Sequence, residues 1–456
     1  MSFNFKSTLK SEDIPFNLPD NWSWYKWGDL ITDYQQGLIR SNRELTESGV
    51  PYLKMNNLNN SGGYDLHKME YTTVSNNELE KYKLHKGDFL LNVRNSKELV
   101  GKTCVIGNHN FDIVYNHMLV RIKHLEGISG IYINALLKIP VMRKFIDRCK
   151  SGTTTVIALY QRDLYDIPIP LPDKSTHDSI VAFAENISSK IELNNRINAE
   201  LEAMAKTLYD YWFVQFDFPI DAALAAKMGD PNLTGKPYKT SGGIMVWNEE
   251  LKREIPEGWG IIYLRTEIEI QRGISYTSKE INGDGIPMIN LNSFNLDGTY
   301  KSEGVKTYSG KFSEKNIVKS GDLLIAATDV TRNADIVGRA ILVPDYYNEN
   351  LVFSMDIAKI ISKNIPSSFL MMLFNSDHYH NYIKWYATGT LVLHLNLDGV
   401  NRYQTELPPK SLLKKFDEFY LPIANRIYMT AKENEKLTEL RDWLLPLLMN
   451  GQVHID

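Results

Sequence analysis

The sequence lacks the features of a secreted, disulfide-rich or membrane-spanning protein. It contains two cysteines, Cys104 and Cys149, among 456 residues, too few for a disulfide framework or a four-cysteine metal site. No apolar run approaches the roughly 18 residues that a membrane span needs. The N-terminal segment MSFNFKSTLKSED has no apolar core of the kind that a secretory signal contains. We therefore expect a cytoplasmic protein that does not contact a membrane.

Motifs for catalysis, metal binding and cofactor binding are also lacking. The segment GDPNLTGKP at Gly229–Pro237 has one residue too many between its glycines for a phosphate loop. Its proline stands where that loop needs Ser or Thr for magnesium. His378 and His380 have neither an HExxH pattern nor a nearby cysteine to complete a zinc site. We predict that this chain holds no catalytic residue, no metal and no cofactor of its own.

The distribution of charge is uneven, although the net charge is only −4. Residues 37–165 carry 18 Lys and Arg against 12 Asp and Glu, whereas residues 272–404 carry 13 of each. Residues 176–255 carry 8 against 12. A basic segment beside an acidic one indicates local contact with a polyanion; chance clustering of charge is the alternative.

What the sequence does contain is a long internal repeat. GVPYLKMNNLN at Gly49–Asn59 matches GIPMINLNSFN at Gly285–Asn295. Further matched pairs are LPDNW with IPEGW, KGDFLLNVR with SGDLLIAAT, LVGK with IVGR, SGTTTVIAL with TGTLVLHLN, and IPLP with ELPP. All of these pairs are separated by 233 to 237 residues. An ordered series at near-constant offset predicts two copies of one domain, because a period this long does not fit a solenoid.

Each copy has the same order of predicted elements. Short apolar runs bounded by Gly, Asn and Pro indicate strands, and a Pro-rich stop then leads into a long helical pattern. Ser175 or Thr176 is suited to cap the first long helix. Apolar residues recur in both helices at alternating steps of four and three, which predicts that each helix packs along a long helical partner.

Two polar interruptions occupy equivalent places in the predicted seam between the helices. Asn198 and Asn434 lie 236 residues apart, as do Asn194 and Thr430. Polar seam residues fix register and partner at some cost in stability; the alternative is that both asparagines face water. The predicted seam consists of Ile187, Ile191, Asn194, Asn198, Leu201, Leu208, Ile423, Ile427, Thr430, Asn434, Leu437 and Leu444.

These patterns predict an α+β protein in which two similar mixed domains are separated by two long antiparallel helices. The expected boundaries are a first domain at residues 1–172, a central helix at 173–216, a connector at 217–254, a second domain at 255–409 and a C-terminal helix at 410–456. Within the connector, the segment AALAAKM is compatible with a short helix.

Taken together, the LPxxW and IPxGW openings, the Gly-Asp-aliphatic strands, the Gly-Thr segments and the helix NNRINAELEAMAKTLYDYWFVQF resemble one family. The chain is similar to the specificity subunits of type I restriction–modification enzymes. The block SGGIMVWNEELKREIPEGW at Ser241–Trp259 is especially close to the central connector of that family. The resemblance spans essentially the whole chain.

The resemblance implies a non-catalytic subunit that recognises double-stranded DNA. Each domain would bind half of a bipartite target, and the paired helices would set the spacing. Two modification subunits would contribute S-adenosylmethionine and adenine-N6 methylation. Restriction subunits would contribute ATP-driven, magnesium-dependent translocation and cleavage.

Within the two domains, loop Lys and Arg side chains suit phosphate contacts, whereas Arg, Asn, Gln and Thr suit base contacts. A solvated surface charge or a turn asparagine is the alternative for each residue. The candidates in the first domain are Arg40, Arg43, Lys54, Asn56, Asn57, Arg94, Lys97, Lys102, Thr153 and Thr154. Those in the second are Arg272, Lys279, Asn290, Asn292, Arg332, Asn333, Arg339 and Thr390.

Two other functions are compatible with the sequence. A coiled-coil scaffold that binds only proteins would show no preference among DNA duplexes. A self-sufficient nuclease with an unrecognised metal site would cleave DNA when supplied with magnesium alone.

Overall fold

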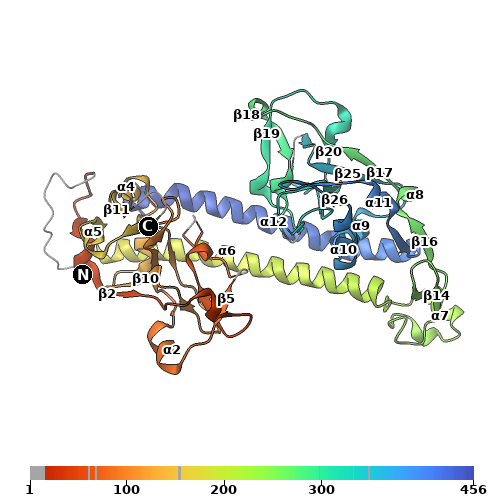
Figure 1. Cartoon of the computed structure of the whole chain (residues 1–456), viewed down its shortest axis with the longest axis horizontal. Helices are drawn as coiled ribbons and strands as arrows, with labels where there is room; N and C mark the ends of the chain where they lie inside the picture. The colour runs from red at the N-terminus through yellow and green to blue at the C-terminus, as the bar shows by residue number, and fades with distance from the viewer. Residues whose placement is uncertain are drawn as a thin grey trace. The chain divides into compact units, whose positions relative to one another are not determined.

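The computed structural model divides the chain into two compact units (Figure 1). Unit 1 comprises Met1–Glu192 and Glu435–Asp456, and unit 2 comprises Leu193–Asn434. Among the residues described, no helix is both long and apolar enough to cross a membrane. The structure describes residues 16–59, 62–66, 69–152, 156–296, 298–331, 333–347 and 350–455.

The mixed domain of unit 1 is built on an antiparallel sheet in the order β2-β10-β6-β8. A second sheet has the order β3-β5-β4-β9, a third has the order β11-β12-β7, and β1 pairs with β13. The elements are β1 (Ser23–Lys26), α1 (Trp27–Leu30), β2 (Ile31–Gln36), β3 (Leu45–Thr46), β4 (Val50–Leu53), β5 (Glu70–Thr72), α2 (Asn76–Tyr82), β6 (Phe89–Asn92), β7 (Arg94–Asn95), β8 (Thr103–Val105), β9 (Val114–Tyr115), β10 (Leu119–His124), α3 (Gly130–Leu136), α4 (Pro140–Arg148), β11 (Lys150–Gly152), β12 (Ile157–Leu159), α5 (Gln161–Tyr165) and β13 (Pro168–Leu171).

The mixed domain of unit 2 repeats this plan. Its sheets have the orders β17-β25-β21-β23, β19-β18-β24-β20 and β22-β27-β26, and β16 pairs with β28. The elements are β16 (Gly260–Tyr263), α8 (Leu264–Glu267), β17 (Ile268–Arg272), β18 (Ile281–Ile289), β19 (Lys306–Tyr308), β20 (Ile317–Val318), β21 (Leu323–Ala326), β22 (Thr328–Asp329), β23 (Ala340–Leu342), β24 (Leu351–Phe353), β25 (Ile357–Ser362), α9 (Ser367–Asn375), α10 (Asp377–Ile383), β26 (Ala387–Thr388), β27 (Leu393–Leu395), α11 (Asp398–Arg402) and β28 (Gln404–Leu407).

The central strands form where the two copies carry continuous apolar runs. All four residues of β6 and all four residues of β21 are buried, as expected for strands covered on both faces. In unit 1 the core beside β6 includes Trp27, Met142 and Ile180. The duplicated sheet orders confirm the predicted α+β class with two similar mixed domains.

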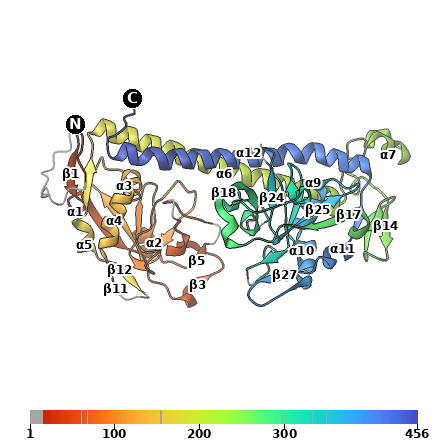
Figure 2. The ribbon, with the colours of Figure 1, turned by 90° about the horizontal axis from the view of Figure 1, so that it is seen from above.

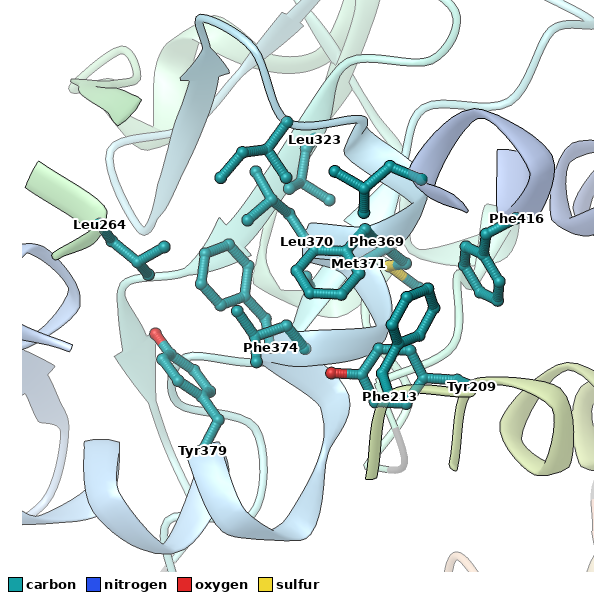
Figure 3. Packing of buried hydrophobic residues seen from close by; sticks show 14 of the residues in the cluster. Tyr209, Phe213, Leu264, Leu323, Phe369, Leu370, Met371, Phe374, Tyr379 and Phe416 are labelled. Carbon is teal, nitrogen blue, oxygen red and sulfur yellow. The ribbon is translucent and has the colours of Figure 1, made fainter. Parts of the chain in front are cut away.

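The core of unit 2 joins the mixed domain to both long helices (Figure 3). Phe213 packs with its ring centroid 5.0 Å from that of Phe369 on α9 and 5.1 Å from that of Phe416. Tyr209 contacts the same two phenylalanines. Fully burying one such ring contributes roughly 1.5–3 kcal/mol, so this cluster fixes the domain on the helices.

The two long helices are α6 (Lys174–Tyr209) and α12 (Lys410–Met449). The prediction that Ser175 or Thr176 caps α6 is wrong. The cap is Asp173, whose Oδ1 accepts from the backbone N–H groups of Ser175 and Thr176. A carboxylate accepts these two amides at once, which a single hydroxyl does less well. α6 ends earlier than the predicted boundary at residue 216, since a π-helical turn at Asp210–Val214 follows it.

Each unit contains an antiparallel pairing of α6 with α12. In unit 1, Ile180 and Ala184 share a core with Leu445 and Leu448. In unit 2 the seam is polar, and Asn194 donates from Nδ2 to Oδ1 of Asn434 at 2.8 Å. The Asn198 amide donates to the carbonyl of Ile427. All twelve predicted seam residues are buried or half-buried.

The connector between the copies is ordered on unit 2. It contains α7 (Ala222–Lys227) in the segment expected to be helical, and a hairpin of β14 (Met245–Asn248) and β15 (Arg253–Pro256). Phe218 lies stacked between Tyr238 and Trp259 at centroid distances of 4.7 and 5.4 Å. Aromatic packing therefore holds a segment whose Gly and Pro content is typical of a surface connector.

Candidate nucleic-acid interface

In unit 1, four segments meet at one end of the main sheet, and we call them pole 1: residues 37–40, 93–102, 116–118 and the described part of 150–159, which is residues 150–152 and 156–159. They converge because the last residues of β2 and β6 lie opposite the first residues of β10. Gln36 of β2 pairs with Val120, and Asn92 of β6 pairs with Leu119. The chain then continues from β6 into β7, where Arg94 pairs with Ala158 of the β11–β12 hairpin. Figure 2 shows this hairpin on the side of unit 1 opposite α6 and α12.

The repeat builds an equivalent pole 2 in unit 2 from residues 273–276, the described part of 327–338 (residues 327–331 and 333–338), 354–356 and 387–395. Arg272 lies opposite Ala358, and Ala326 lies opposite Ile357. The β26–β27 hairpin is attached through Thr328, which pairs with His394. In Figure 2, β27 lies on the side of unit 2 opposite α12.

The two poles differ in charge. The segments of pole 1 contain five Lys or Arg residues and one acidic residue. Those of pole 2 contain three Asp, and the one Arg in the same stretches of sequence lies outside the described residues. Because phosphate binding requires cations, pole 1 is the better electrostatic match to a polyanion.

In pole 1, hydrogen-bond donors hold the loop that follows the central strand. The buried Asn92 donates from Nδ2 to the Leu99 carbonyl at 3.0 Å. The Arg143 guanidinium on α4 donates to the carbonyls of Gly101 and Val100 at 2.6 and 3.2 Å. The loop is therefore held by its carbonyl groups.

In pole 2, an acceptor holds the equivalent loop. The Asp329 side chain is fully buried. Its Oδ1 accepts from the N–H of Thr331 at 2.6 Å, and its Oδ2 accepts from those of Ile336 and Val337 at 2.6 and 2.9 Å. Three amide bonds to one carboxylate satisfy a charge that would otherwise be costly to bury.

Two histidines beside the poles are kept neutral. Burial, together with the nearby Arg94 charge, lowers the pKa of His117. Burial, together with the charges of Arg339 and Lys384, lowers the pKa of His380 to about 4. Neutral imidazoles at these positions do not add positive charge to either pole near neutral pH.

The hairpins of the two poles share a glycine that no other residue can replace without strain. Gly152 has φ +141° and Gly389 has φ +142°. A Cβ on Gly389 would lie 2.0 Å from the Val392 carbonyl oxygen, and one on Gly152 would lie 2.4 Å from that of Val156. Both hairpins therefore begin their tips with the same backbone geometry.

Comparison with known proteins agrees with this architecture. Residues 19–203 match the family model described as the type I restriction modification DNA specificity domain. The MjaIX specificity subunit of Methanocaldococcus jannaschii, a type I restriction enzyme subunit, is 23% identical over 488 residues, covering 100% of this chain and 99% of that protein. The chain is therefore similar to type I specificity subunits over its whole length.

Further relatives agree with this assignment. The HindI specificity subunit of Haemophilus influenzae is 24% identical over 351 residues, or 68% of this chain and 74% of that protein. The crystal structure of a type I S subunit from M. genitalium shares the fold, with a TM-score of 0.53 at 15% identity, covering 97% of this chain and 99% of that one. Both of these curated relatives are named as specificity subunits.

Half of the predicted DNA-contacting residues have exposed side chains. Within the part of the chain that the structure describes, none of these side chains has an internal hydrogen bond or ion pair. Arg43 and Lys279 occupy equivalent single-turn helices, each with a capping box, and Asn56 and Asn292 occupy another equivalent pair of turns. The exposed set is Arg43, Asn56, Arg94, Lys97, Arg272, Lys279, Asn292, Asn333 and Thr390.

Four predicted cationic contacts are engaged inside the fold instead. Arg40 donates to Glu78 at 2.9 Å and to Thr72, and Lys54 forms an ion pair with Glu70 at 2.9 Å. Lys102 donates to the Leu58 carbonyl. Arg339 donates to the Asn375 carbonyl at 2.7 Å. A DNA contact by these side chains would first have to break these bonds.

The predictions for Asn57 and Asn290 as base contacts are wrong. Both side chains are buried, at 4% and 3% exposure. Asn57 accepts from the Lys54 N–H and donates to the Asp65 carbonyl, whereas Asn290 donates to the Gly304 carbonyl at 2.7 Å. A turn asparagine that caps its own backbone has no remaining edge for a base. The predicted Thr153, Thr154 and Arg332 lie outside the described residues.

Sequence reasoning missed the apolar residues that the poles expose. Leu391 is 89% exposed, Trp385 88% and Ile39 71%. Phosphates and base edges are bound by polar and charged residues, so exposed apolar residues are not expected at such a site. The signal in the sequence is the apolar pair that directly follows Gly-Thr in the repeat segment TGTLV. No group of three or more His, Cys, Asp or Glu side chains suited to a metal occurs among the residues described.

Proposed function

We propose that this chain is the DNA-recognition subunit of a type I restriction–modification complex and binds a bipartite double-stranded target. Pole 1 would bind one half-site and pole 2 the other. The observation that carries the proposal is the duplication of the pole: the same loops and the same hairpin recur at the same end of equivalent sheets. Duplicated recognition surfaces suit two short sequences better than one continuous sequence.

The spacing between the half-sites would be set by α6 and α12. Each helix is long and contributes residues to both units. The Asn194–Asn434 bond supports a fixed register, because the buried Asn194 amide meets the half-buried Asn434 in only one alignment of the helices.

The chemistry would belong to partner subunits. Two modification subunits would bind S-adenosylmethionine and methylate adenine, and restriction subunits would use ATP and magnesium. Exposed apolar residues on the long helices, including Phe419, Met429 and Trp443, support docking of protein partners, since large exposed apolar groups mark interaction surfaces.

Mapping methylated adenines across a genome that expresses this chain with its modification partner tests the proposal. We expect methylation at one interrupted sequence with two defined halves. Methylation without sequence preference would favour the protein-only scaffold. Cleavage of DNA by the isolated chain with magnesium would favour the nuclease.

The spacer role has its own test. Inserting seven residues at matched points of α6 and α12 keeps the seam in phase. The preferred distance between half-sites should change, while the half-sites themselves stay the same. An unchanged distance would contradict a spacer role. Inserting the same seven residues in the connector after Gly235 is the matched control, and it should leave the distance unaltered.

A further inference from the structure

The β26–β27 hairpin of pole 2 ends in an apolar tip, which we define as Thr390, Leu391 and Val392. Leu391 is 89% exposed and Val392 38% exposed. In the 3₁₀ turn directly before β26, Trp385 is 88% exposed. Holding such groups in water forgoes the free energy of burying them, which indicates that another molecule covers them.

The base of this hairpin is fixed. Leu395 of β27 is buried, and its N–H donates to the Ala327 carbonyl at 2.9 Å. β27 pairs with β22 on one side and with β26 on the other. Gly389 closes the tip through a positive φ that other residues rarely adopt. A rigid base presents the tip as a preformed projection.

The surroundings of the tip favour the bases of DNA over its phosphates. Pole 2 contributes little positive charge, and it also exposes Val330 (63%) and Met355 (44%). The repeat gives this hairpin the same place in its domain as β11–β12, which belongs to the segment that matches the DNA specificity model. An apolar projection on a DNA-binding face suits insertion between stacked base pairs.

We propose that Leu391 enters the base stack of the half-site bound by the second domain, an inference that rests on the proposed function. Val392 then contacts the exposed face of one neighbouring base pair. The ligand is a double-stranded DNA step that unstacks easily, as pyrimidine–purine steps do. This mode of recognition selects sequence by deformability in addition to hydrogen bonding.

Fluorescence of 2-aminopurine tests the insertion, because this base brightens when it is unstacked. The full chain in complex with its modification subunit is mixed with duplexes that carry the methylation-mapped target and one 2-aminopurine at successive positions. We expect brightening at one step other than the methylated adenine. Leu391→Ala should abolish this signal and weaken specific binding roughly tenfold. Leu391→Met should keep both, because it restores an apolar side chain of similar volume.

Phe312→Ala is the matched control, since Phe312 is an exposed apolar residue of the same domain (42%) outside pole 2. It should leave signal and affinity unchanged. An unaltered signal in Leu391→Ala would overturn the insertion. So would a loss of complex assembly in Leu391→Ala, which would make the tip a protein contact. If the wild-type complex shows no sequence preference at all, the proposed function fails and the insertion fails with it.

Discussion

The loop after the central strand adopts the same place in both poles, yet the buried side chain that binds it is an asparagine in one and an aspartate in the other. In pole 1 the donors Asn92 and Arg143 bind loop carbonyls. In pole 2 the acceptor Asp329 binds loop N–H groups. The comparison shows that a duplicated fold can keep a loop in place while the buried side chain that binds it changes. Such freedom lets each domain acquire its own specificity.

The poles also differ in how they would gain affinity. Pole 1 is basic and suits phosphates, whereas pole 2 exposes apolar groups and carries few cations. Counterion release favours the first mode and makes it sensitive to salt. Removal of apolar surface from water favours the second and is much less sensitive to salt.

Among the variants that test this difference between the loops, Asp329→Ala is expected to cause the largest loss of stability. Three N–H groups, two of them buried, would lose their acceptor, and the free energy of unfolding should fall by roughly 3–5 kcal/mol. Urea unfolding measures the loss, and amide exchange at Thr331, Ile336 and Val337 locates it. Asn95→Ala is the control at the equivalent position, where the side chain accepts only from Ser96 N–H. Equal losses in both variants would contradict the difference between the loops.

A smaller effect is expected from Arg143→Met in pole 1. The variant keeps the apolar stem of Arg143 but removes its bonds to two loop carbonyls, so stability should fall by about 1–2 kcal/mol. Carbonyls tolerate the loss better than N–H groups because water reaches this partly exposed site. The neighbouring Lys144→Met is the control on the same helix and should change stability by less than about 0.5 kcal/mol. A loss as large as that of Asp329→Ala would show that donors and acceptors hold the loops equally.

The electrostatic difference predicts a change in salt dependence. In the complex with the modification subunit, replacing Arg94 and Lys97 by Gln should lower the slope of log affinity against log salt by about 0.9 for each lost phosphate contact. Affinity at moderate salt should fall by a few fold. Lys123→Gln, outside pole 1, should leave the slope unchanged. A slope that is unchanged in the double variant would remove pole 1 from the phosphate contacts.

The smallest expected effect is a shift in the pKa of two glutamates at positions where the two domains are alike. Glu44 and Glu280 cap equivalent turns, and hydrogen bonds from Ser41 and Thr277 lower the pKa of each carboxyl. A lowered folded-state pKa means that each carboxylate stabilises the fold above its unfolded pKa and loses this effect as the pH falls. NMR titration should show both residues ionising below the ordinary range of glutamate. A normal pKa at either residue would break the equivalence of the two turns.

Much of the fold could be predicted because the sequence contains two copies of the same pattern of elements. The matched segments at near-constant offset identified two similar domains, and the spacing of apolar residues identified both long helices. The cap of α6 was missed by a few residues because Asp, Ser and Thr can all accept amide bonds. The direction in which the chain enters the helix decides which of these neighbouring side chains accepts the first amide hydrogen bonds.

The candidate interface was less predictable. Sequence pattern cannot distinguish Arg94, which is exposed, from Arg40, which is bound to Glu78. It also cannot distinguish Asn56, which is exposed, from its neighbour Asn57, which is buried. The availability of a side chain depends on partners that are distant in sequence.

The sequence by itself determined the duplication, the class of each domain and the two long helices, because apolar periodicity and turn residues act over short stretches of chain. The tertiary structure alone decided which cations stay in solvent, which aspartate holds a loop and which hairpin exposes a leucine. Those outcomes depend on packing between segments such as β22 and β27, which lie more than 60 residues apart.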